Sequence, residues 1–134
     1  MDIDILNTAG SALSAERLRM DAISSNIANS HTTLDADGNY NPYKRKVVEF
    51  QTVLNQKTGL SAGVTVNQIS EAPEDLRKVY EPSNANADES GYVEYPNISI
   101  ETEMVDLVTA QTAYKANIQA IQAFKTMFNS ALEI

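Results

Sequence analysis

The sequence of 134 residues contains no cysteine, a single histidine and no long run of apolar residues. Without cysteine the chain has no disulfide, no thiol nucleophile and no thiolate ligand for a metal. The longest apolar runs span only a few residues, far short of the roughly 20 needed to cross a bilayer as a helix. These absences exclude disulfide-stabilised domains and cysteine chemistry, and they predict no membrane-spanning helix.

Basic residues are also scarce. The chain has 10 Lys and Arg against 18 Asp and Glu, which gives a net charge of −8 and a pI of about 4.5. Because phosphate neutralisation requires Lys and Arg, nucleic acid is not expected as the main partner. Residues 1–5 are acidic and lack the basic and apolar regions of a cleaved signal peptide. We therefore expect no nucleic-acid partner, no direct membrane insertion and no cleaved signal.

Strong core formers are few for a chain of this length. Ile, Leu, Val and Phe together number 31, or roughly 23% of the residues. Chains with a high net charge in which these four residue types make up less than about 20% are typically disordered. The fraction in this sequence lies just above that limit. It is long enough for one domain but short of core material for a self-contained globule. We expect it to complete its burial against other molecules.

Apolar residues recur at seven-residue spacing along about residues 3–29. This heptad-like stripe predicts a helix. The stripe consists of Leu6, Ala9, Leu13, Met20, Ile23 and Ile27. Gly10 lies inside the predicted helix and lowers its stability by about 1 kcal/mol relative to Ala.

A stronger helical pattern covers about residues 98–134, where neither Pro nor Gly occurs. Its apolar positions include Met104, Leu107, Tyr114, Ile118, Ile121, Phe124, Phe128 and Leu132. A helix of about 33 residues would be roughly 50 Å long. The apolar face is wider than a two-stranded seam needs, so the helix is expected to contact more than one neighbour. The sequence leaves open whether the extra width is covered by the middle of the chain or by another subunit.

The middle of the chain, residues 34–97, carries all four Pro and four of the five Gly. Partly alternating β-branched and aromatic residues predict strands at 44–54 and 63–69, with weaker candidates at 79–80 and 92–93. Residues 35–42 and 82–91 are predicted loops. The predicted fold is therefore mainly α with a small β-containing insert, its two long terminal helices packed as an antiparallel coiled coil. The predicted segments are 1–33, 34–97 and 98–134.

Candidate chemical sites are weak. His31 lies in a polar stretch and is interpreted as a solvated residue at a helix end. Residues 35–39 partly resemble a calcium-binding loop, but their glycine is at the fourth position and the twelfth position is Lys46, so a tight Asp-Gly turn fits better. The basic cluster at 44–46 has two interpretations, a weak contact site for an acidic partner or a phosphate and the solvated start of a strand, of which we favour the second. We expect no catalytic residue, no metal and no cofactor.

Two blocks of residues at opposite ends of the chain resemble the signatures of bacterial flagellar rod and hook proteins. The N-terminal block is Ser25, Asn26, Ile27, Ala28 and Asn29. The C-terminal block includes Glu103, Met104, Val105, Tyr114 and Asn117. A third block before the last helix, with Gly91, Tyr92, Pro96 and Asn97, resembles proximal-rod members of the family. The length of the chain also suits those members, since the distal-rod and hook proteins are much longer.

The resemblance implies a structural subunit of the flagellar basal body, exported by the flagellar type III apparatus and assembled beyond the inner membrane. It implies that the terminal helices form a coiled-coil domain lining the tube of a rod that transmits torque and passes exported subunits. The implied partners are other copies of the chain, other rod proteins and a basal-body adaptor protein. The family-motif Asn residues are expected to satisfy backbone groups at the helix end. The alternative is a soluble helical adaptor or export chaperone that binds one partner through the same stripes.

Overall fold

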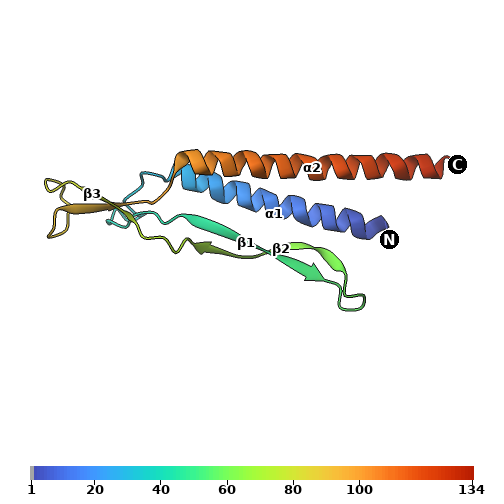
Figure 1. Ribbon diagram of the computed structural model, residues 1–134, viewed down its shortest axis with the longest axis horizontal. Helices are drawn as coiled ribbons and strands as arrows, with labels where there is room; N and C mark the ends of the chain where they lie inside the picture. The colour runs from blue at the N-terminus through green and yellow to red at the C-terminus, as the bar shows by residue number, and fades with distance from the viewer. Residues whose placement is uncertain (1) are drawn as a thin grey trace.

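The computed structural model describes residues 2–134, so that Met1 of the first predicted segment lies outside the described residues. Two long helices and two β-hairpins form an elongated molecule (Figure 1). The elements in chain order are α1 (Asp2–Ala28), β1 (Lys46–Leu54), β2 (Ser61–Glu71), β3 (Arg77–Tyr80), β4 (Tyr92–Tyr95) and α2 (Ile100–Leu132). Both predicted helices and all four predicted strands are confirmed, with boundaries shifted by at most two residues.

The two helices pack against each other and run in opposite directions (Figure 1). Helix α2 has 33 residues, whereas α1 has 27. Ser99 caps the start of α2, because its hydroxyl accepts a hydrogen bond from the backbone N–H of Thr102. Glu101 and Glu103 in the first turn place negative charge at the positive end of the helix dipole. The start of α2 is thus encoded locally, directly after the last proline.

Helix α1 lies between α2 and the β1–β2 hairpin, giving three layers (Figure 1). Strands β1 and β2 pair antiparallel from Lys46 opposite Glu71 to Leu54 opposite Ser61, with two register shifts. Strands β3 and β4 form a second antiparallel pair beyond the ends of the helices. The middle segment is therefore two separate two-stranded sheets joined by loops.

The β1–β2 hairpin approaches α1 most closely at Gly63. Its φ is +132°, and a Cβ atom there would lie 2.5 Å from Oγ of Ser11. The Ser11 hydroxyl accepts a hydrogen bond of 3.0 Å from the backbone N–H of Val64. Glycine is required at this position because both the backbone conformation and the space exclude a side chain.

The buried apolar core is small. Among the described residues it consists of Ala15, Ala22, Ile23, Val93 and Ala110. Many larger apolar side chains on both helices and on the β1–β2 hairpin are exposed instead. No helix in residues 2–134 has the length and apolarity needed to cross a membrane. The chain alone thus leaves uncovered much of the apolar surface that could stabilise it.

Candidate functional site: a buried polar junction

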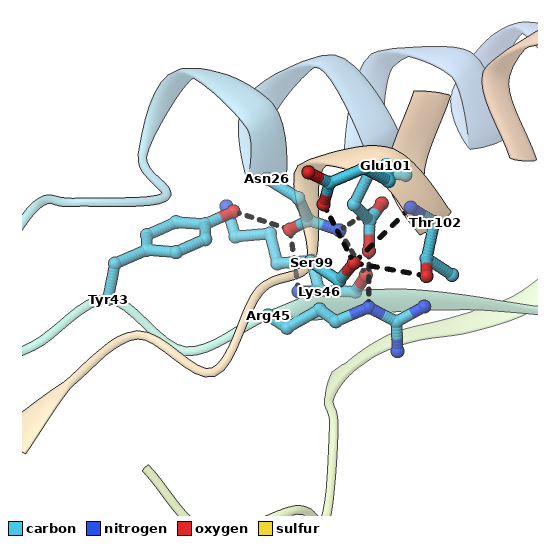
Figure 2. A network of polar contacts seen from close by, with 8 residues as sticks. Asn26, Tyr43, Arg45, Lys46, Ser99, Glu101 and Thr102 are labelled. Atoms are coloured by element: carbon cyan, nitrogen blue, oxygen red, sulfur yellow. Dashed lines mark hydrogen bonds and ion pairs between the residues drawn. The ribbon is translucent and has the colours of Figure 1, made fainter. Parts of the chain in front are cut away.

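A buried asparagine joins the end of α1 to the start of β1. Asn26 is 1% exposed. Its carbonyl oxygen accepts from the backbone N–H of Lys46 at 2.8 Å, and its amide nitrogen donates to the backbone carbonyl of Lys46 at 2.9 Å (Figure 2). The side chain therefore pairs with one β1 residue as a neighbouring strand would. This pairing fixes the position of the chain where it enters the hairpin.

The same asparagine is linked to the first turn of α2. Its amide nitrogen also donates to Oε2 of Glu103 at 3.4 Å. The other carboxylate oxygen of Glu103 accepts from Nε of Arg45 in an ion pair. The Glu103 side chain is 2% exposed and that of Arg45 is 28% exposed. The hydrogen bond to Glu103 raises the pKa of Arg45 above its ordinary value, although burial acts in the opposite direction.

The polar junction is defined here as Asn26, Tyr43, Arg45, Lys46 and Glu103. It lies where α1 ends, β1 begins and α2 begins, so it connects all three layers (Figures 1 and 2). Its members come from positions up to 77 residues apart in the sequence. A buried carboxylate, a guanidinium and a carboxamide that satisfy one another hold the elements in a single register.

The interpretation of residues 44–46 as the solvated start of a strand is wrong for Arg45. The side chain turns inward to the buried carboxylate of Glu103, while Lys44 and Lys46 are exposed. The basic cluster does stand at the start of a strand, but nothing in the sequence identifies Glu103, 58 residues away, as the partner of Arg45. The signal that was available is the position of Glu103 on the apolar face of the last helix, next to the stripe.

Further hydrogen bonds extend the junction along the last turn of α1. The Tyr43 hydroxyl donates to the carbonyl oxygen of Asn26 at 3.0 Å and lies 3.1 Å from Oγ of Ser25. Asn29 donates from its side chain to the backbone carbonyl of Ser25 at 2.8 Å, which satisfies a carbonyl at the helix end. Thr32 donates in turn to the side-chain oxygen of Asn29. The N-terminal block thus terminates the helix and positions the chain that follows.

The third motif block shapes the β3–β4 hairpin and its exit. Gly91 has a φ of +84°, and a Cβ atom there would lie 2.9 Å from the ring of Tyr80. Tyr80 and Tyr92 pack edge to face with ring centroids 5.4 Å apart. Pro96 is fully buried, and Asn97 donates to the backbone carbonyl of Asp75 at 3.1 Å. These residues fix the direction in which the chain enters α2.

The remaining motif residues lie on the two helices. Asn117 donates to the backbone carbonyl of Ala113. Val105 is 65% exposed and Ala28 is exposed, whereas Ile27 is half-buried. For Met104, Val105 and Ala28, the described chain shows no burial that would explain a role.

The predicted apolar stripes are only partly covered within the chain. On α1, Ile23 is buried, Leu6 is 38% exposed, and the half-buried positions are Ala9, Leu13, Met20 and Ile27. On α2, the half-buried positions are Leu107, Tyr114, Ile118, Ile121 and Phe124. Met104, Phe128 and Leu132 are 53%, 45% and 70% exposed. Their role as contacts to other subunits stays a prediction.

The residue types of the polar junction do not form a metal site. Within residues 2–134 no group of three or more His, Asp or Glu residues is arranged to hold a metal ion. The loop at 35–39 closes on itself, because Oδ1 of Asp35 accepts from the backbone N–H groups of Asp37 and Asn39. The tight turn predicted there is confirmed, with Gly38 at a φ of +82°. The polar groups of the junction bind one another.

Comparison with known proteins defines the class from both ends of the chain. Residues 6–33 match the family described as "Flagella basal body rod protein". Residues 89–134 match the family described as "Flagellar basal body rod FlgEFG protein C-terminal". These ranges contain the α1 and α2 contributions to the polar junction. The class is therefore that of the flagellar basal-body rod proteins.

Curated relatives narrow the class. The flagellar basal-body rod protein FlgC of Bacillus subtilis is 42% identical over 96% of this chain and 95% of its own length. The FlgC proteins of Salmonella typhimurium and Aquifex aeolicus are 40% and 39% identical, each over at least 96% of both chains. The chain belongs to the FlgC family. Membership assigns it a structural role in the rod of the flagellar basal body and does not favour the adaptor alternative.

Proposed function

We propose that the chain is a subunit of the proximal rod, in which residues 1–33 and 98–134 form the axial domain and residues 34–97 form the insert. The observation that carries the proposal is the contact between the two signature blocks. Asn26 of the N-terminal block donates to Glu103 of the C-terminal block, and the two helices extend side by side from that contact. The mechanical role of this contact is to fix two long helices at one end.

The helices are proposed to pack as a coiled coil that becomes complete only in the assembly. Within one chain, α1 covers a single face of α2, and the last half-buried residue on α2 is Phe124. Met104, Val105 and Val108 stay exposed near the start of α2. A helical assembly uses contacts that do not close on themselves, so each subunit needs complementary surfaces on several sides. The uncovered parts of α2 supply such surfaces.

The small core supports export in an unfolded or easily unfolded form. Three of the five buried apolar residues are alanine, so the apolar surface removed from water in one chain is limited. A subunit of this kind gains stability when neighbours cover its helices, and that gain offsets the entropy of ordering. We propose the flagellar type III apparatus as the exporter. Other copies, other rod proteins and the basal-body adaptor protein are the proposed neighbours in a rod that spans the periplasm.

The proposed role is mechanical and involves no catalysis. In the finished rod the subunits would transmit torque, and the channel they surround would pass later exported subunits. The ion pair and hydrogen bonds of the polar junction support this role, because they link α1, α2 and the β1–β2 hairpin into a unit that resists sliding of one layer along another.

The test is deletion of the gene in the chain's own bacterium, followed by complementation and purification of basal bodies. We expect the deletion to abolish swimming, and the complemented strain to carry the chain in its basal bodies. Swimming without the gene, or basal bodies that lack the chain, would contradict the proposal. Electron microscopy of the same particles would locate the chain along the rod and test the proximal position.

The adaptor alternative predicts different behaviour in solution. An adaptor should fold alone, whereas the proposed rod subunit should have largely disordered termini as a monomer. Amide signals in nuclear magnetic resonance spectra distinguish the two. Sharp, dispersed signals across residues 3–29 and 98–134 of the isolated monomer would contradict the expected disorder.

A further inference from the structure

An open groove lies at the end of the molecule opposite the polar junction. Its walls are the first half of α1, the tip of the β1–β2 hairpin and one side of α2, with Ile5, Thr8, Ala12, Leu60 and Asn117 among the lining residues. Its volume is about 490 Å³. Ile5 and Leu60 are 51% and 69% exposed. This space, called the hairpin groove from here on, is an apolar recess that the chain itself leaves unfilled.

The same end of the molecule carries an uncovered helical segment. Helix α2 continues past the start of α1 (Figure 1), and all residues from Lys125 to Ile134 are exposed. This segment, called the helix overhang, presents Met127, Phe128 and Leu132, which are 64%, 45% and 70% exposed. Phe128 stacks on Phe124, with ring centroids 6.3 Å apart. The overhang therefore continues the apolar face of α2 where α1 no longer covers it.

The hairpin groove and the start of the helix overhang carry opposite charges. Asp4 is the one charged residue among the described residues that line the groove. Lys125 is the first residue of the overhang, and the only other charged side chain of that segment, Glu133, lies at its far end. Asp4 and Lys125 take part in no ion pair within the described chain. Opposite charges guide the choice and the register of a partner surface.

The overhang cannot fill the groove of its own chain. Asn117 of the same helix already forms one wall of the groove, and the overhang continues from there as an unbroken helix directed away from it. The occupant must therefore come from a second molecule. A second copy supplies one overhang for every groove, and the contact joins two different surfaces, so it repeats from copy to copy as a ring or a helical assembly requires.

We propose that the helix overhang of one copy docks in the hairpin groove of a second copy, with its apolar side chains against Ile5 and Leu60 and its lysine toward Asp4. The inference rests on the proposed function, since it names the contact through which this chain would meet its own kind in the rod. Burial of the exposed Phe128 and Leu132 side chains supplies the driving force.

Cysteine cross-linking tests the contact, because the natural chain has no cysteine. Two differently tagged variants, Leu60→Cys and Leu132→Cys, are expressed together, and purified basal bodies are treated with a short bismaleimide. We expect a cross-linked dimer that carries both tags. The matched control replaces Leu132→Cys with Gln119→Cys, an exposed position on the same helix, and should give no such dimer. Thr58→Cys with Ile134→Cys provides a second pair if a first variant fails to assemble.

The outcomes separate this contact from the function on which it rests. Basal bodies that contain both variants but give no dimer with either pair would overturn the contact. Leu60→Cys labelled with a photoreactive maleimide and linked by light to a different rod protein would overturn it as well, because the occupant would not be a second copy. Basal bodies that lack even the wild-type chain would instead overturn the proposed function.

Discussion

The carboxylate of Glu103 and the guanidinium of Arg45 form an ion pair between residues 58 positions apart, and the Glu103 side chain is only 2% exposed. Both hairpins lie between the two residues in the sequence, so the pair closes the two ends of this part of the chain onto each other. A buried ion pair contributes little net stability when it is compared with apolar residues of similar size. Replacing only one of the two residues is costly, because the charge of the other is left without a partner.

Glu103→Ala should therefore lower the free energy of unfolding of the subunit by about 1–3 kcal/mol. The loss is smaller than for a fully buried pair because the Arg45 side chain, which keeps its charge, is partly exposed. When the variant and the wild type are expressed together, this corresponds to about a 5- to 150-fold smaller share of the variant in purified basal bodies. Mass spectrometry of the two versions measures the ratio. The double variant Arg45→Met with Glu103→Leu removes both charges and should recover part of the loss. Equal losses in the single and double variants would show that the uncompensated charge is not the cause.

Asn26→Asp should be more harmful than its small change in shape suggests. The substitution replaces the amide nitrogen by an oxygen that faces the backbone carbonyl of Lys46 at 2.9 Å and Oε2 of Glu103 at 3.4 Å. Two hydrogen bonds are lost, and two carboxylates come together in a buried site, at a cost of at least about 2 kcal/mol. We expect loss of swimming and of the chain from basal bodies. Asn7→Asp on the exposed side of the same helix is the control and should leave both unchanged.

The sequence predicted the elements well and the polar junction poorly, and the reason is physical. Heptad spacing is a local pattern, so it located both helices, and β-branched residues located the four strands. Asn26 and Glu103 were recognised only through their motif blocks, because which group a polar side chain bonds depends on how distant segments meet. Arg45 was misread for the same reason, since a local run of basic residues is typical of an exposed strand end.

Gly63→Ala should detach the β1–β2 hairpin from α1. The new Cβ would lie 2.5 Å from the Ser11 hydroxyl oxygen, at a φ of +132° that alanine rarely adopts. We expect the variant to lose competition with the wild type for incorporation into basal bodies. Gly10→Ala is the matched control, because Gly10 lies inside α1 with open space around it. That change should stabilise the helix by about 1 kcal/mol, and an equal loss in both variants would contradict the close contact.

The β3–β4 hairpin should open at high pH. The hydroxyl of Tyr95 donates to Oε2 of Glu81 at 2.9 Å, and this bond raises the pKa of Tyr95 above its ordinary value of 10. The folded state therefore favours the protonated phenol. The resulting stability is present below pH 10 and is lost as the pH rises through the higher pKa of the folded state. Methyl signals of Val79 and Val93, which lie opposite each other in the hairpin, can be followed from pH 8 to 12 and measure the opening. Tyr95→Phe lacks this bond, so its hairpin should be weaker at neutral pH and should not show this loss.

Phe128→Asp and Ile121→Asp separate assembly from the fold of the single chain. Phe128 is 45% exposed on the helix overhang, so an aspartate there meets water until a neighbour covers it. Ile121 is half-buried in the chain itself, on the helix that packs against α1. Both variants should block assembly by burying an unpaired charge, while export into the culture medium continues. Only Ile121→Asp should also weaken the packing of the two helices within the chain, so in competition with the wild type it should be lost from basal bodies more completely than Phe128→Asp. Gln122→Asp, at an exposed position between them, should swim normally. Normal swimming of the Phe128→Asp strain would contradict the assignment of this residue to an interface between subunits.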